Sequence, residues 1–169
     1  MRSLAAKDGR RNRALWGFAT ALYDQPGVAP TCLALQDRYG ADIPLLLAAI
    51  WHGETGRGRL ARGQVGDWRS CARLWRSAAI APLRAVRTAI RPAAKADAAI
   101  DRLRKAVLAA ELAAERLLLR DLETLARPQA ATDPRTQRAD ARFNAGLFVR
   151  DPRARTELTK LFSALGPSP

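Results

Sequence analysis

Six arginines between positions 69 and 91 recur at helical spacing and are the clearest candidates for binding chemistry. They are Arg69, Arg73, Arg76, Arg84, Arg87 and Arg91. On an ideal helix they lie within about 80° of one another and about 110° from the apolar residues of the same segment. A guanidinium presents a planar fork of N–H donors that matches a carboxylate or a phosphate. This Arg stripe therefore predicts contact with an anionic partner.

The charge of the chain agrees with this prediction. The net charge is +13, from 29 basic and 16 acidic residues, and residues 57 to 104 hold 12 basic and 3 acidic residues, a net +9. Such a surface attracts acidic proteins, nucleic acid and anionic lipid. Of the basic residues 25 are Arg, and an excess of Arg and Ala is also typical of a GC-rich genome. Three interpretations stay open: an acidic protein partner, which we prefer, nucleic acid, and a solvated helix face without a partner.

A second group of side chains could support acid–base chemistry in a small polar pocket. This polar cluster comprises Gln36, Asp37, Arg38, Asp42, His52 and Glu54. Structural roles also account for it, since Asp42 is placed to cap a helix and a histidine at a helix C-terminus interacts favourably with the dipole. We therefore predict no catalytic residue and prefer a non-enzymatic interaction protein, with an enzyme built near residues 36–54 as a further alternative.

The sequence predicts neither a metal site nor a cofactor. The chain has one His, and no Cys or second His stands at ligand spacing from it. The Gly-rich stretch from Gly53 to Gly58 is not followed by the Lys and Ser/Thr of a phosphate-binding loop, and no dinucleotide or zinc-protease motif is present. We expect Cys32 and Cys71 to be reduced and buried. No secretory signal or membrane-spanning run is found, so we expect a cytoplasmic protein. The oligomeric state cannot be inferred.

Composition predicts an all-α fold, a compact helical bundle with a long C-terminal helix. Ala occurs 35 times and Leu 23 times, against 10 for Val and Ile together. The apolar spacing predicts helices from Asn12 to Tyr23, from about 29 to 39, and from Asp42 to His52, the last apolar nearly all round. The Gly and Arg residues of the stretch 57–66 predict a basic loop.

The second half of the chain is predicted to contain longer helices. Asp67 is a candidate N-cap for a helix reaching residue 91, which Pro82 kinks or divides into two abutting helices. A helix from about 94 to 126 follows, which either projects from the bundle or folds back on its predecessor. The domain prediction is a disordered basic N-terminus over 1–11, a helical domain over 12–127, and a linker with a short helical tail over 128–169.

Four tryptophans lie within these predicted helices. Trp51, Trp68 and Trp75 fall on apolar stripes, which favours packing in the core over stacking on bases. Trp16 lies off the main apolar face of its helix and is a candidate exposed anchor.

Two blocks of sequence carry a resemblance to a known family. They are LWGFATALYDQPGVAPTCLALQDRYGADIPLLLAAIW, from Leu15 to Trp51, and WRSAAIAPLRAVR, from Trp75 to Arg87. Their uncommon elements are Leu15-Trp16, Tyr23 before Pro26-Gly27, Leu35-Gln36-Asp37, Gly40-Ala41-Asp42 and Pro82-Leu83-Arg84. The sequence resembles a family of short proteobacterial proteins known as a domain of unknown function. Over about residues 15–91 the resemblance implies a helical fold and a bacterial source, and it implies no reaction, cofactor or catalytic residue.

Overall fold

The part of the chain that the structure describes contains helices and no strands. The structure is a computed structural model that describes residues 14–126, 133–149 and 151–166. Its elements in chain order are α2 (Leu15–Tyr23), α3 (Val28–Tyr39), α4 (Ile43–Glu54), α5 (Arg62–Trp75), the π-helical turn η1 (Arg76–Ile80), α6 (Ala81–Ile90), the 3₁₀ turn η2 (Ala93–Lys95), α7 (Ala98–Leu125), α8 (Pro134–Gly146), the 3₁₀ turn η3 (Pro152–Ala154) and α9 (Arg155–Ala164). The all-α prediction is confirmed. Among these helices, none has the length and apolar character to cross a membrane.

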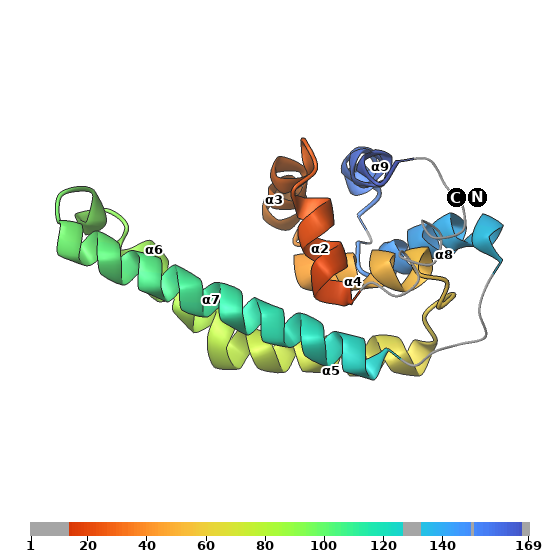
Figure 1. The fold of residues 1–169 in the computed structure, drawn as a ribbon, viewed down its shortest axis with the longest axis horizontal. Helices are drawn as coiled ribbons and strands as arrows, with labels where there is room; N and C mark the ends of the chain where they lie inside the picture. Colours follow the sequence, from red (N-terminus) through yellow and green to blue (C-terminus); the bar gives the residue numbers. More distant parts are fainter. Residues whose placement is uncertain (1–13, 127–132, 150, 167–169) are drawn as a thin grey trace, which may run out of the picture.

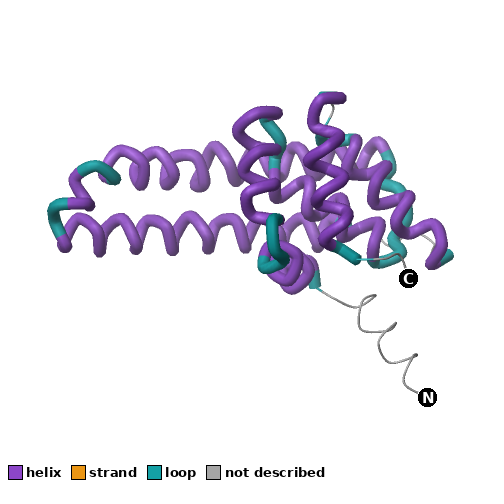
Figure 2. Tube along the Cα trace, turned by 90° about the horizontal axis from the view of Figure 1, so that it is seen from above, coloured by secondary structure: helices purple, strands orange, loops and turns teal. Residues whose placement is uncertain are grey.

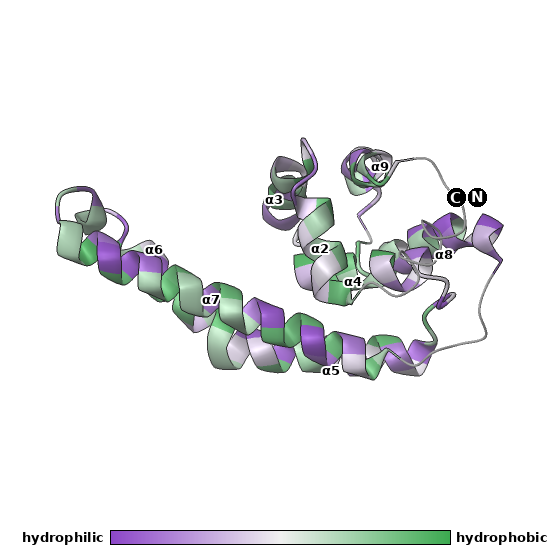
Figure 3. Ribbon diagram, in the orientation of Figure 1, coloured by the Kyte–Doolittle hydropathy of each residue, from purple (hydrophilic) through white to green (hydrophobic). Residues whose placement is uncertain are grey.

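Helix α4 lies at the centre of the core. Asp42 caps it by accepting a hydrogen bond from the Leu45 amide at 3.3 Å, and Pro44 occupies its first turn, so the helix begins where the sequence predicts. Every residue from Leu45 to Gly53 is buried, in agreement with the apolar pattern around the whole helix. Figure 3 shows the hydrophobic character of α4 beside the more mixed surfaces of the other helices.

Helices α5 and α6, joined by η1, form one rod that runs antiparallel to α7. The hairpin extends well beyond the other helices, as two perpendicular views show (Figures 1 and 2). Of the sequence alternatives, α7 therefore both folds back on its predecessor and projects from the bundle. The π-turn precedes Pro82, whose ring would clash with a carbonyl oxygen one α-turn back. Trp75 and Ala81, which flank the π-turn, both keep right-handed helical backbone angles, so the rod continues through it.

Helix α5 begins earlier than the sequence predicts. Asp67, the expected N-cap, lies inside a helix that begins at Arg62 after Ala61, so half of the expected loop is helical. Gly63 and Gly66 favour a loop by local propensity. The buried side chains of Gln64 and Trp68 fix the helical turns instead, because packing against the core outweighs that propensity.

The chain after α7 belongs to the same core. Helix α8 packs along α4, with Ala141 and Ala145 fully buried, and α9 buries Leu161 and Phe162. The long helix is thus followed by two further helices, which corrects its expected C-terminal position. Residues 133–166, predicted as linker and tail, supply part of the core. The predicted disorder over 1–11, the Asn12 cap, and parts of the linker (127–132) and tail (167–169) lie outside the described residues.

The predicted burial of the tryptophans is confirmed for two of the four and differs in degree for the other two. Trp51 and Trp68 are fully buried. Trp75 is half-buried, and its indole N–H donates to the Asp121 carboxylate at 2.9 Å. Trp16 is half-buried rather than exposed, with the Arg116 guanidinium 5.2 Å from its ring centre.

Candidate partner-binding cleft

A cleft of about 720 Å³ lies between the N-terminal helices and the helical hairpin. Helices α2 and α3 and the start of α4 form one wall, and the α5–η1–α6 rod with α7 forms the other. Tyr23, Leu33 and Leu112 line it and are 40%, 52% and 50% exposed. The volume falls within the range of about 300–1,000 Å³ that is usual for binding sites.

The π-turn determines which side chains of the rod line the cleft. Ala72, Arg76, Ile80, Arg84 and Thr88 all line it, at intervals of four residues. On an uninterrupted α-helix each such interval rotates the side chain by about 40°, so the series would spiral around the rod. A π-turn holds more residues per turn and takes up part of this rotation. The π-turn η1 therefore determines which arginines of the Arg stripe reach the cleft.

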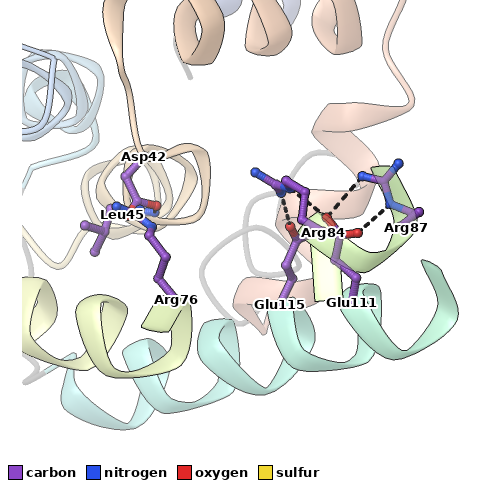
Figure 4. Close-up of polar contacts among 7 residues, drawn as sticks. All are labelled: Asp42, Leu45, Arg76, Arg84, Arg87, Glu111 and Glu115. Carbon is purple, nitrogen blue, oxygen red and sulfur yellow. Dashed lines mark hydrogen bonds and ion pairs between the residues drawn. The ribbon is translucent and has the colours of Figure 1, made fainter. Parts of the chain in front are cut away.

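One ion pair lies where α4 meets the rod. The Asp42 carboxylate uses one oxygen to cap α4 at Leu45 and the other to accept a hydrogen bond from the Arg76 guanidinium (Figure 4). The Asp42 side chain is 13% exposed and that of Arg76 is 53% exposed. The carboxylate is thus covered while the cation that it holds faces the cleft.

A second ionic cluster lies two turns further along the rod (Figure 4). Glu111 of α7 accepts hydrogen bonds from Arg84 Nε at 2.8 Å and from Arg87 Nε at 2.6 Å. Arg84 also donates to Glu115 at 3.1 Å. The Glu111 side chain is 4% exposed, whereas those of Arg84 and Arg87 are 40% and 27% exposed. Glu111 therefore acts as the buried anchor of two more accessible cations.

The pKa values of the two glutamates of this cluster are shifted in opposite directions. Burial is the largest influence on each and raises its pKa. At Glu111 the hydrogen bonds from Arg87 and Arg84 outweigh burial, and the pKa is held below its usual value. At Glu115 burial outweighs the attraction of Arg84, and the pKa stays above its usual value.

These directions predict different effects for two conservative substitutions. A lowered folded-state pKa means that ionised Glu111 stabilises the fold above its unfolded-state pKa, and that this stability is lost as the pH falls through the folded-state value. We expect Glu111→Gln to lower the free energy of unfolding at pH 7 by about 2 kcal/mol. Glu115→Gln should cause no loss, because its ionised form is disfavoured in the folded state. Urea unfolding of both variants at pH 7 measures this, and equal losses would contradict it.

The rest of the Arg stripe lies outside the cleft. Arg69 donates to the Leu147 carbonyl oxygen at 2.8 Å and lies over the Phe148 ring. Arg73 is exposed, and its side chain donates to the Ser70 hydroxyl at 3.0 Å. Arg91 is exposed at the far end of the hairpin. The structure thus brings half of the predicted stripe to one cleft.

The polar cluster does not converge on one site. Gln36 and Asp42 line the cleft. Asp37 and Arg38 are exposed and lie outside its lining. Glu54, at the other end of α4, forms an ion pair with Arg138 of α8, in which both side chains are 11% exposed.

His52 lies in the core and holds a loop. Its Nδ1–H donates to the Gly58 carbonyl oxygen at 3.1 Å, and its Nε2 lies 3.4 Å from the Gln64 amide nitrogen. Its ring packs edge-on against Trp68. Asn144 of α8 donates to the same Gly58 carbonyl at 3.0 Å. These contacts assign His52 a structural position that joins α4 to the loop and to α5.

Sequence reasoning missed the acidic half of the cleft. Glu111 follows Val107 by four residues and precedes Ala114 and Leu118 at helical spacing, so it stands on the apolar face of α7. A carboxylate on such a face requires a buried cation. That spacing was the available signal, and it points to a basic partner on a neighbouring helix.

Metal and thiol chemistry find no support in the cleft. Within the described ranges no group of three His, Cys, Asp or Glu side chains could hold a metal ion. Cys32 lines the cleft and is buried, and burial raises its pKa to about 11. Cys71 is half-buried rather than buried as expected, and both thiols are free.

Part of the residues that carry the family resemblance line this cleft. Trp16, Tyr23, Gln36, Asp42 and Arg84 all belong to the elements quoted above, and all line it. A family model matches residues 14–122, from the start of α2 almost to the end of α7. Comparison with curated proteins and with solved structures finds no match. Since the matched region is more than half of the chain, the protein belongs to the family described as Protein of unknown function (DUF2390).

Proposed function

We propose that the protein is a non-enzymatic interaction protein whose cleft binds an acidic segment of a partner protein. Arg76, Arg84 and Arg87 would contact the partner, whereas Arg69, Arg73 and Arg91 lie outside the cleft and would not. The exposure of the charged groups carries the proposal. The guanidinium side chains of the cleft are 53%, 40% and 27% exposed, whereas the carboxylates of Asp42 and Glu111 that orient them are 13% and 4% exposed.

The apolar lining favours a protein segment as the ligand. Tyr23, Leu33 and Leu112 are large side chains that stay partly exposed on both walls of the cleft. Apolar surface of this kind next to accessible arginines is typical of protein interfaces. A partner that supplies apolar side chains and carboxylates would match both features.

Nucleic acid is the less favoured partner. The exposed apolar side chains of Leu33 and Leu112 in the lining have no counterpart in a sugar–phosphate backbone, which proteins contact mainly through charge. The enzyme alternative loses support because His52 packs in the core, away from Gln36 and Asp42. Two free thiols suit a reducing compartment, and we place this activity in the cytoplasm.

Affinity capture with and without nuclease tests the proposal. The tagged chain is incubated with lysate of its source organism at moderate salt, beside the variants Arg76→Glu and Arg73→Glu. We expect a protein partner that survives nuclease, and a loss of at least about tenfold in its recovery by Arg76→Glu, because charge reversal at a desolvated contact is costly. Arg73→Glu, an exposed position outside the cleft, is the matched control. Recovery that nuclease abolishes, or that both variants reduce equally, would contradict the proposal.

A further inference from the structure

We infer that the partner segment is an amphipathic α-helix that places two acidic residues, about two turns apart, on Arg76 and Arg84. This inference rests on the proposed function and specifies the chemistry of its partner. It follows from the walls of the cleft, the interval between the two arginines and the exposed apolar side chains of the lining.

The walls of the cleft favour a helical ligand. They consist of helices, and the described part of the chain has no strand and so no sheet edge. An extended segment would therefore bring unpaired N–H and C=O groups against the exposed side chains of Leu33 and Leu112. A helix bonds its own backbone groups and presents only side chains.

The two arginines set the spacing of the acidic residues. Arg76 and Arg84 stand eight residues apart on a continuous rod, which corresponds to about 12 Å along its axis. A helix that lies along the rod covers this distance in seven or eight residues of its own. The cleft also presents exposed apolar side chains, Leu33 on one wall and Leu112 on the other. The expected pattern is an acidic residue at i and at i+7 or i+8, with apolar residues at i+3 and i+4.

The existing ion pairs are compatible with such a ligand. Arg76 bonds Asp42 through one terminal nitrogen, and Arg84 bonds Glu111 and Glu115 through Nε and one terminal nitrogen. Each guanidinium carries five N–H donors, so further donors remain for an incoming carboxylate. Binding therefore leaves the covered carboxylates paired.

Selection from a random peptide library tests this inference. Peptides of about sixteen residues, enough for about four helical turns, are displayed on phage and selected on the full chain. The affinity of each enriched peptide is then measured for the wild type, for the cleft variants Arg76→Gln and Leu33→Glu, and for the matched controls Arg73→Gln and Leu74→Glu. Leu74 is 66% exposed and lies outside the cleft lining.

The inference predicts peptides that lose at least about tenfold in affinity on both cleft variants and not on the controls. They should be helical when bound and carry the acidic pair, and moving one acid by two positions should weaken binding about tenfold. Cleft-dependent peptides that bind in extended form, or without the acidic pair, would overturn the helix inference and leave the proposed function standing. Peptides insensitive to both cleft variants, or no enriched peptide, would count against the proposed function itself.

Discussion

A chain that ends at Ala126 is expected to lose cooperative thermal unfolding. This truncation keeps the whole family-matched region, 14–122, and removes α8 and α9. The removed segment supplies six apolar residues that are at most 7% exposed: Ala141, Ala145, Val149, Ala154, Leu161 and Phe162. Loss of this surface uncovers one side of α4, which is buried all round. The expected product keeps helical circular dichroism, binds a hydrophobic dye, and melts without a sharp transition.

Buried polar groups add to the effect of the truncation. Asn144 of α8 accepts a hydrogen bond from the Leu60 amide at 2.8 Å and donates to the Gly58 carbonyl oxygen at 3.0 Å. Glu54 loses its ion pair with Arg138 at the same time. A chain that ends at Gly166 keeps every described helix and is the matched control. If the shorter chain melts as cooperatively as this control, α8 and α9 are not part of the folding unit.

The substitution Gly53→Ala is expected to destabilise the protein by about 3 kcal/mol. Gly53 lies in the last turn of α4, against α8, and a Cβ atom added there would overlap the backbone nitrogen and Cα of Ala141. The obstacle is main chain and not the end of a flexible side chain, so the two helices must separate to admit one methyl group. That separation would also disturb the bonds that Asn144 makes with the loop.

A glycine elsewhere in the chain gives the control for this substitution. Gly66 lies within α5, and an added Cβ atom would have nothing within 4 Å. Gly66→Ala should therefore stabilise the protein by about 0.5–1 kcal/mol through helix propensity alone. Urea unfolding of both variants measures the difference. Two changes of the same sign would show that the close approach of α4 and α8 does not limit Gly53.

Local sequence patterns predict much of this fold, because helix caps, apolar spacing and turns depend on neighbouring residues alone. The cap at Asp42 and the apolar run from Leu45 to Trp51 are sufficient to predict where α4 begins and that it is buried. The break at Pro26-Gly27 is equally local, and Gly27 has the positive φ of 81° that favours glycine. These features need no knowledge of what the helices contact.

The remaining features depend on contacts between distant parts of the chain. Ideal-helix geometry places Val86 on the same apolar stripe as Trp68 and Ala72, yet Val86 is 47% exposed. The π-turn between them changes the rotation of the later residues, and no propensity predicts its position. The contact of Gly53 with α8 is likewise visible only after the helices have packed.

The candidate site could be predicted only in those features that depend on local spacing. The Arg stripe identifies the cations of the cleft, since helical spacing is a local property. It does not distinguish Arg76 and Arg84, which line the cleft, from Arg73, which does not. That distinction depends on the position of the N-terminal helices and on Glu111 of α7.

Site-specific photo-crosslinking tests the central claim most directly. A photo-reactive amino acid replaces Leu33 on one wall of the cleft or, as a control, Leu74 outside it; the two are 52% and 66% exposed. The chain is irradiated in lysate of its source organism after nuclease treatment, and the linked peptides are identified by mass spectrometry. The account predicts links from position 33, and not from position 74, to a protein segment that combines acidic and apolar residues, with loss of those links on Arg76→Glu. Equal labelling from both positions, or labelling from position 33 that Arg76→Glu leaves unchanged, would contradict it.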